Sequence, residues 1–322
     1  MPPMTRRRFL STGLAVSALA GCMEAPPRRL RVGTYLWPGY EPLFLARHLG
    51  KLDPRTIQIA EYPTASELML SFQNRALDVV TLTVDDVVRL VGNGEDVRIV
   101  HVISRSHGGD ALIGRKEIAD VPGLRGKTIG FEANTLGAFF LAKALEHHGV
   151  DLKEVTLRPW RVDRLNRQLH IGEVDAVVTY EPFRSHLLRA GARVLFDSSQ
   201  IPGEIVDVLI VRSDLLENRL PALQQMIAGW WAGFEFLRQE PAAAAEVVAP
   251  RGRTTPASFL ASLDLLEFVS AEENRRLLTP PDSTLPDLLL RTSEFMLRHQ
   301  LLPRSVVVPE LRSNQLTVPS RR

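Results

Sequence analysis

Cysteine is almost absent from this chain of 322 residues, which contains a single one, Cys22. One thiol cannot form an intramolecular disulfide, and it cannot supply a cysteine-cluster metal site. Long apolar runs are absent too, because no stretch after the N-terminal segment offers the roughly 18 uncharged apolar residues of a membrane-spanning helix. The sequence therefore excludes a disulfide framework and predicts no transmembrane helix in the body of the chain.

An excess of one charge sign is also missing from most of the chain. The first 21 residues hold three arginines and no acids, which leaves 36 Lys and Arg against 37 Asp and Glu in the rest. The basic sequence pI of about 8.8 is therefore largely a property of this N-terminal segment. A near-neutral surface without a basic run gives no electrostatic footprint for a nucleic acid partner.

Several enzyme motifs are missing as well. The sequence has no nucleophile elbow, no dinucleotide-binding glycine pattern and no His-Glu-x-x-His. Gly126-Lys127-Thr128 is similar to the end of a phosphate loop, but Val121 stands where the first glycine is required, and the triplet precedes a predicted strand. His147 and His148 lack further ligands at metal spacing. We therefore expect no cofactor and no metal.

An export leader is indicated by the N-terminal residues. A basic segment at Thr5–Leu10 precedes a short apolar run at Leu14–Ala20, and small residues follow. This order is typical of a secretory signal, and the apolar run is too short to span a bilayer. The consecutive arginines before Phe9 resemble a twin-arginine leader. The sequence therefore predicts a cleaved signal peptide at residues 1–21.

Lipid attachment is indicated at the end of this leader. Leu19-Ala20-Gly21-Cys22 resembles the bacterial lipobox, which implies cleavage after Gly21 and acylation of the Cys22 thiol. Residues 22–29, with two prolines, then predict a short tether. The alternative is a buried cysteine behind an ordinary apolar helix.

Strand-like and helix-like runs alternate over the first two thirds of the remaining chain, which predicts an α/β fold with parallel sheets and crossover helices. The expected strands are Leu30–Tyr35, Thr56–Glu61, Leu77–Leu82, Val97–Ile103, Lys127–Phe131, Val155–Arg158, Val174–Tyr180 and Val206–Val211. The expected helices between them are Glu41–Gly50, Ala65–Arg75, Asp85–Val91, Leu136–His147 and Arg164–Ile171. Thr83 and Asp86 have the spacing of a capping box at a helix start.

Two halves of this region resemble each other. From Gly33 to Asp78 is 45 positions, and from Gly130 to Asp175 is also 45, with similar strand residues around each. Equal spacing favours two similarly built lobes with a cleft between them.

Beyond residue 211 the pattern is mostly helical, and we expect this part to return to the first lobe. Apolar residues recur at three and four residue steps from Leu223 to Leu237. The spacing predicts a helix with one buried face, a partner-docking surface being the alternative.

Several motifs of the chain, taken together, resemble those of a known family. The motifs that carry the resemblance are the leader with its lipobox, then Val32-Gly33-Thr34-Tyr35-Leu36-Trp37-Pro38-Gly39-Tyr40-Glu41-Pro42-Leu43-Phe44-Leu45-Ala46, Gly123-Leu124-Arg125-Gly126-Lys127-Thr128-Ile129-Gly130 and Tyr180-Glu181-Pro182-Phe183. In order and spacing they are similar to substrate-binding proteins of nitrate, sulfonate and taurine ABC transporters, including thiamin-pyrimidine-like members.

This resemblance implies the type II periplasmic-binding-protein fold, with two lobes built on parallel-dominated sheets and a ligand cleft between them. It implies residues 30–114 and 207–322 as one lobe and 115–206 as the other, with chain crossings near 114–126 and 201–207. It further implies a monomer, held by its lipid on the periplasmic side of a bacterial membrane, that closes on a small molecule and presents it to a permease.

Ligand contacts are expected where strands end, because ligands in such folds lie beyond the carboxyl ends of the strands. Trp37 and Tyr40 could instead be core, Asp85, Asn134 and Thr135 could simply cap helices, and His107 could face solvent. The candidate ligand-binding residues are Trp37, Tyr40, Glu41, Asp85, His107, Asp110, Asn134, Thr135, Tyr180, Glu181 and Asp207.

Five of these candidates are acids, and only one, His107, is a candidate cation. A carboxylate beside a bound anion costs several kcal/mol if desolvated. The balance therefore favours an amine or nitrogen heterocycle, such as a pyrimidine precursor, over a sulfonate.

Two other function classes remain open. The same fold could serve as an extracytoplasmic sensor for a membrane signalling receptor, or as an enzyme, since related folds include enzymes of quinone biosynthesis. One similar branch makes the thiamin pyrimidine with a cysteine-rich motif, and this chain has no cysteine after Cys22. We expect a binding protein rather than an enzyme.

Overall fold

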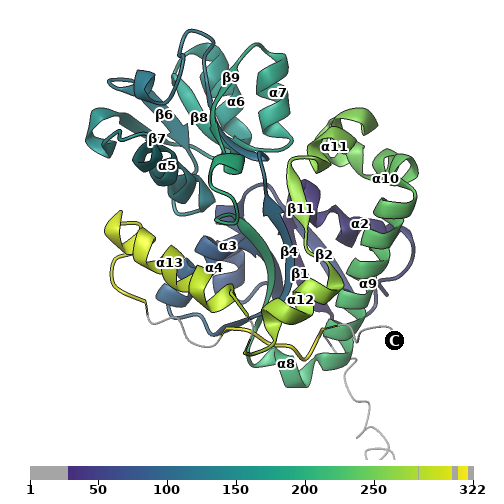
Figure 1. Cartoon of the computed structure of the whole chain (residues 1–322). Coiled ribbons are helices and arrows are strands. Elements are labelled where there is room, and N and C mark those ends of the chain that lie inside the picture. Colours follow the sequence, from purple (N-terminus) through teal and green to yellow (C-terminus); the bar gives the residue numbers. More distant parts are fainter. Residues whose placement is uncertain (1–27, 282, 307–310, 318–322) are drawn as a thin grey trace, which may run out of the picture.

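Two β-sheets, each covered by helices, divide the molecule into two lobes that lie one above the other in Figure 1. The computed structural model describes residues 28–281, 283–306 and 311–317. The expected leader, Cys22 and most of the expected tether lie outside these described residues. The α/β fold with two lobes is confirmed.

The first lobe is built on a six-stranded sheet with the order β11-β4-β10-β3-β1-β2. All residues of β3 and β10 are buried, as expected for central strands with helices on both faces. The strands are β1 (Leu30–Tyr35), β2 (Ile57–Tyr62), β3 (Val79–Thr83), β4 (Val97–Ser106), β10 (Val206–Arg212) and β11 (Leu266–Phe268), and the first connecting helices are α2 (Glu41–His48), α3 (Ala65–Gln73) and α4 (Val84–Gly92).

The second lobe is built on a five-stranded sheet with the order β7-β6-β8-β5-β9. Its strands are β5 (Asp110–Gly114), β6 (Thr128–Phe131), β7 (Thr156–Pro159), β8 (Ala176–Tyr180) and β9 (Arg193–Asp197). Its helices are α5 (Leu136–His147), α6 (Val162–Ile171) and α7 (Phe183–Arg189).

The expectation that parallel pairs dominate both sheets is wrong. Four of the strand pairs in the described residues are parallel and five are antiparallel. The reason is that β5 and β10 each enter a lobe from the other one. Such a strand starts at the sheet edge where its neighbours end, so it runs against them.

The internal similarity expected from the equal spacing is present in the two sheets. Gly33 of β1 pairs with Val80 of β3, and Gly130 of β6 pairs with Val177 of β8. Asp78 accepts a hydrogen bond of 2.8 Å from the backbone N–H of Arg31. In the second lobe, Asp175 accepts the equivalent 2.9 Å bond from Thr128, so one aspartate fixes the same strand pair in each lobe.

The chain crosses between lobes earlier than expected. β4 ends at Ser106 in the first sheet and β5 begins at Asp110 in the second, so the first crossing is at residues 107–109. The expected first-lobe boundary at residue 114 is therefore wrong, because β5 pairs with β8 and β9. The return crossing lies between Asp197 and Val206, whereas it was expected at residues 201–207.

The two crossings lie side by side. The backbone N–H of Ser106 donates to the carbonyl of Ile205, at 3.0 Å. The backbone N–H of Gly108 donates to the hydroxyl of Ser198 over 2.7 Å. These bonds tie the two crossing segments together, and we call this pair of segments the hinge.

The C-terminal third is mostly helical and packs on the first lobe, as expected (Figure 1). Trp230 and Leu223 are fully buried, so the apolar face of α9 is core. A Cβ atom on Gly233 would lie 2.0 Å from the carbonyl oxygen of Pro42, so this glycine allows α9 to approach α2. The helices are α8 (Leu215–Asn218), α9 (Leu220–Gln239), α10 (Pro241–Val248), α11 (Pro256–Leu263), α12 (Ala271–Leu278) and α13 (Leu285–Arg298).

The last helix, α13, contacts both lobes. It packs against α4 of the first lobe. Its Phe295 ring lies 5.2 Å from the ring of Phe139 in α5. Within the described part of the chain, no helix is long and apolar enough to cross a membrane.

Candidate functional site

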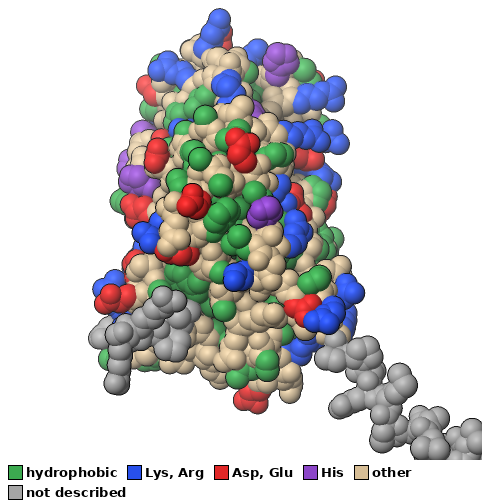
Figure 2. Space-filling view, turned by 90° about the vertical axis from the view of Figure 1, so that its right-hand side faces the viewer, with side chains coloured by type: hydrophobic (Ala, Val, Ile, Leu, Met, Phe, Trp, Pro, Cys, Tyr) green, Lys and Arg blue, Asp and Glu red, His purple; other side chains and the backbone are tan. Residues whose placement is uncertain are grey.

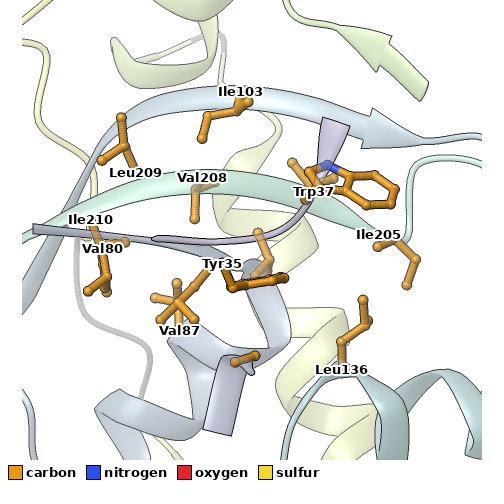
Figure 3. Close-up of a cluster of buried hydrophobic side chains, with 14 of the residues drawn as sticks. Tyr35, Trp37, Val80, Val87, Ile103, Leu136, Ile205, Val208, Leu209 and Ile210 are labelled. Carbon is orange, nitrogen blue, oxygen red and sulfur yellow. The ribbon is translucent and has the colours of Figure 1, made fainter. Parts of the chain in front are cut away.

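Three aromatic residues mark the cleft end of β1. Tyr35 is the last residue of the strand, and Trp37 and Tyr40 follow in the turn into α2. All three are buried. Figure 3 shows Tyr35 and Trp37 near Ile205 of the return crossing and Leu136, the first residue of α5. Aromatic side chains from the first lobe therefore face the second lobe and the hinge.

The hinge passes close to Trp37 because residue 109 is a glycine. A Cβ atom on Gly109 would lie 2.6 Å from Cη2 of Trp37 and 3.1 Å from the carbonyl oxygen of Leu265. Any larger residue would push the crossing away from the indole. The packing of Trp37 thus depends on the first crossing.

A buried hydrogen-bond network connects Tyr40 to the return strand. The Tyr40 hydroxyl donates to Oδ1 of Asp207 at 2.7 Å, and the Ser104 hydroxyl donates to Oδ2 at 2.6 Å. The hydroxyls of Tyr35 and Tyr40 are 3.3 Å apart. The network places Asp207, at the start of β10, beside the aromatic residues of β1.

Tyr180 brings the second lobe into this group. It ends β8, and its ring lies 5.8 Å from the ring of Tyr35 and 6.2 Å from that of Trp37, both edge-on. The Tyr180 hydroxyl is buried. The residue that ends β8 in the second lobe is therefore in ring contact with the aromatic residues at the end of β1 in the first.

Acidic side chains surround these aromatics. Burial is the main reason that the pKa of Asp110 is raised to about 8, and the charges of Asp207, Asp85 and Glu181 add to it. Burial also raises the pKa of Asp207 to about 7, against the hydrogen bonds from its serine and tyrosine partners. These carboxyls come from both lobes and are close enough to perturb one another.

The start of α4 contributes two of the acids. Burial raises the pKa of Asp85 to about 6, and burial together with the charge of Asp85 raises that of Asp86 well above its usual range. The expected capping box is not formed, because the Thr83 hydroxyl donates to Oδ2 of Asp86 instead of accepting a backbone N–H.

Several buried polar atoms at the strand ends have no hydrogen-bond partner among the described residues. They include Oδ2 of Asp85, Oδ1 of Asp86 and the hydroxyl of Tyr180. Buried polar groups are usually satisfied, so such atoms require an explanation. A polar ligand between the lobes would supply the missing partners.

Glu41 differs from the other acids because it has its own cation. Nε of Arg251 donates to Oε2 of Glu41 at 2.9 Å, and the same guanidinium contacts Glu61. The guanidinium carbon lies 3.1 Å from the ring centroid of Phe44. Burial still raises the pKa of Glu41 to about 7. This predicted site residue is thus part of a structural ion pair.

Of the other four predicted site residues, two are exposed and two are buried. His107 is exposed at the first crossing, and Asn134 is exposed with a φ of +60°. The Thr135 hydroxyl accepts from the backbone N–H of Gly137, which is the capping role left open above. Oε1 of Glu181 accepts from Arg184 and Ser185, while Oε2 is buried without a partner in the described chain.

The structure therefore brings together Trp37, Tyr40, Asp85, Asp110, Tyr180 and Asp207. Sequence reasoning missed Tyr35, Ser104 and Asp86, all buried in the same group. Tyr35 and Asp86 could have been found from the sequence, because Tyr35 ends β1 and Asp86 closely follows the end of β3. Ser104 could not, because it lies within β4.

Direct hydrogen bonds hold the two lobes together. The backbone N–H of Ser66 in α3 donates to Oε1 of Glu132 at 3.2 Å, and the Ser66 hydroxyl binds the same oxygen. Arg161 of the second lobe pairs with Glu67 of the first. With the site residues buried, these contacts define a closed arrangement.

The acid cluster does not have the geometry of a metal site. Over the residues that the structure describes, no group of three or more His, Cys, Asp or Glu side chains is placed to hold a metal ion. The groups that the two lobes present here are carboxyls, hydroxyls and aromatic rings.

Known proteins share this fold. The alkanesulfonate-binding protein SsuA of Xanthomonas axonopodis pv. citri, bound to MOPS, is similar over 88% of this chain and 97% of its own, with a TM-score of 0.74 and 19% identity. The ligand-binding component of an ABC-type import system from Staphylococcus aureus gives a TM-score of 0.69 at 13% identity, over 89% of this chain and 100% of its own.

An enzyme has the same fold. The desulfurization enzyme DszB is similar over 91% of this chain and 97% of its own, with a TM-score of 0.60 and 18% identity. At such identities the likeness shows the fold, which is that of periplasmic binding proteins. No curated protein matches the sequence. Residues 23–250, most of the chain, match the NMT1-like family, and the chain therefore belongs to the NMT1-like family.

Proposed function

We propose that this chain is an extracytoplasmic solute-binding protein, which captures a small molecule between its lobes and delivers it to the permease of an ABC importer. The fold, the two adjacent crossings and the ligand-binding roles of SsuA and the Staphylococcus aureus protein support this function. Contacts with both lobes favour the closed state, so ligand binding and closure are coupled.

The proposed ligand is an amine or a nitrogen heterocycle. The observation that carries this choice is the set of buried acids, of which Asp85 and Asp86 each have one oxygen without a partner in the described residues. A cation or N–H donor would bond to Asp86 and Asp85, while the aromatic rings would contact its flat face. Arg89 offsets part of the charge of these two acids. A sulfonate is the alternative that the ligand test must distinguish.

The proposed location is the periplasmic side of a bacterial membrane, with the mature chain held by a lipid on Cys22. The leader and the lipobox support it, and both lie outside the described residues. Figure 2 shows a face on which basic and acidic side chains are interspersed, which suits a protein without a nucleic acid partner.

A thermal-shift screen of residues 23–322 tests this function. The panel contains amines, pyrimidines, sulfonates, nitrate and amino acids, because a ligand that binds only the folded state raises the melting temperature. A shift with an amine or heterocycle supports the proposal. If only a sulfonate raises the melting temperature, the proposed ligand class is wrong. If the protein converts the ligand to a product, it is an enzyme. Pull-down of a signalling receptor instead of a permease establishes a sensor.

A further inference from the structure

Glu132 reaches from one lobe to a helix N-terminus in the other. It follows β6 in the second lobe, is 6% exposed, and accepts from the backbone N–H and the hydroxyl of Ser66. Ser66 is the second residue of α3 in the first lobe. A carboxylate of the protein itself therefore lies where the first turn of α3 presents its free N–H groups.

This position is the one that suits an anion. The free N–H groups and the dipole at a helix N-terminus attract negative charge, and the Ser66 hydroxyl adds a donor. Another first-turn donor, the N–H of Glu67, is already bonded to the Thr64 side chain at 3.2 Å. Ser66 presents two donors at this turn, its N–H and its hydroxyl, and both bind Glu132.

The charge of Glu132 acts on the candidate site. Burial is the main reason that the pKa values of Asp86 and Tyr180 are raised, and the charge of Glu132 adds to both. Asp86 is fully buried, and its Oδ1 has no partner in the described part of the chain. The side chain that fills the anion position of α3 therefore acts electrostatically on the residues proposed to bind the ligand.

We propose that Glu132 sets the ligand selectivity of this cleft, by filling the anion position of α3 and thereby excluding anionic ligands such as sulfonates. The inference rests on the proposed function and deepens it. An incoming sulfonate would have to displace the Glu132 side chain from the N–H and the hydroxyl of Ser66. A cationic ligand leaves the bonds between Glu132 and Ser66 in place.

If Glu132 served only as a contact between the lobes, the loss of another such contact should have the same effect on ligand binding. The pair of Glu67 and Arg161 also joins the lobes, but it lies at the exposed rim, with side chains 38% and 44% exposed. Glu67→Gln therefore weakens a contact between lobes without vacating the anion position. It is the matched control for Glu132→Ala.

The test is calorimetric titration of ethanesulfonate into wild-type protein, Glu132→Ala, Glu132→Gln and Glu67→Gln. We expect at least tenfold tighter binding to Glu132→Ala than to wild type, a smaller gain for Glu132→Gln, and no gain for Glu67→Gln. Adding Ser66→Ala to Glu132→Ala should remove the gain.

Two results overturn the inference. In the first, Glu132→Ala binds ethanesulfonate no more tightly than wild type does. In the second, Glu67→Gln gains as much affinity for ethanesulfonate as Glu132→Ala. Failure of the proposed ligand class is separate, because it appears as wild type that binds no amine or heterocycle. If Glu132→Ala gains affinity for ethanesulfonate while wild type binds no amine or heterocycle, the role of Glu132 stands and the proposed ligand class is wrong.

Discussion

The Tyr180 ring of the second lobe lies 5.8 Å from the Tyr35 ring of the first, edge-on. Tyr180 ends β8 and Tyr35 ends β1, two strands that stand in the two separate sheets. Their contact shows that the carboxyl ends of strands from both lobes meet at one place. The acids around this place are buried, so their charges act at short range and in a low dielectric.

Tyr180→Phe tests whether the unpaired hydroxyl serves a ligand. The ring contacts with Tyr35 and Trp37 remain in this variant, and the hydroxyl that is lost has no partner in the described chain. We therefore expect an unchanged or slightly higher melting temperature and about a fivefold or greater loss of ligand affinity. A large loss of stability would show that the hydroxyl supports the fold.

Asp110→Asn tests whether the buried charge of Asp110 lowers the stability of the ligand-free protein and raises its affinity for a cationic ligand. Burial and the charges of Asp207, Asp85 and Glu181 oppose ionisation of Asp110. Removing this charge should raise the melting temperature of the ligand-free protein at pH 8.5 by roughly 2 °C or more. Affinity for a cationic ligand should fall at least tenfold. Unfolding and titration of the same sample measure both, and unchanged affinity would exclude Asp110 from the site.

The stability of the ligand-free protein should fall as pH rises from about 5 to 8.5. Asp85, Asp207 and Asp110 have folded-state pKa values of about 6, 7 and 8, above the ordinary value of 3.8. The folded state therefore binds more protons than the unfolded state in this window, and each acid loses its contribution as pH passes its folded pKa. Thermal unfolding across this range checks the direction.

Binding of a cation should show the opposite trend. The same three carboxyls must be ionised to attract it, so affinity for a quaternary ammonium probe, whose own charge is constant, should rise between pH 5.5 and 8.5. Affinity that is flat or falls with pH would mean that these acids do not face the ligand.

Asp78→Asn should destabilise the protein more than Asp175→Asn. Both aspartates accept the equivalent strand N–H, but Asp78 also pairs with the guanidinium of Arg31. Hydrogen bonds to charged groups contribute about 1.5–3 kcal/mol, so the loss at Asp78 should lie in that range and the loss at Asp175 below it. Denaturant unfolding measures both, and equal losses would show that Arg31 adds nothing.

Much of the fold could be predicted from the sequence. The apolar runs predicted β1 and α5 with their observed bounds, and the 45-residue spacing predicted two similar lobes. Local patterns fix such elements because their residues are neighbours in the chain. The short strand β11 was missed, since its three residues carry no clear alternation.

The lobe boundary and the closed site could not be predicted in this way. β5 belongs to the second sheet because of its partners β8 and β9, which lie far along the chain. Tyr40 and Asp207 are 167 positions apart, and Glu132 reaches Ser66 across the cleft. Only the folded chain brings such pairs together, so sequence spacing could not show that Glu132 lies at the start of α3.

Calorimetric titration of residues 23–322 at pH 8 tests the central claim most directly. The two probes are 4-amino-5-aminomethyl-2-methylpyrimidine, a basic heterocycle, and ethanesulfonate. We predict saturable binding of the pyrimidine and no measurable binding of the sulfonate, because buried acids from both lobes face the ligand. Saturable binding of the sulfonate without binding of any basic heterocycle or amine would contradict the claim.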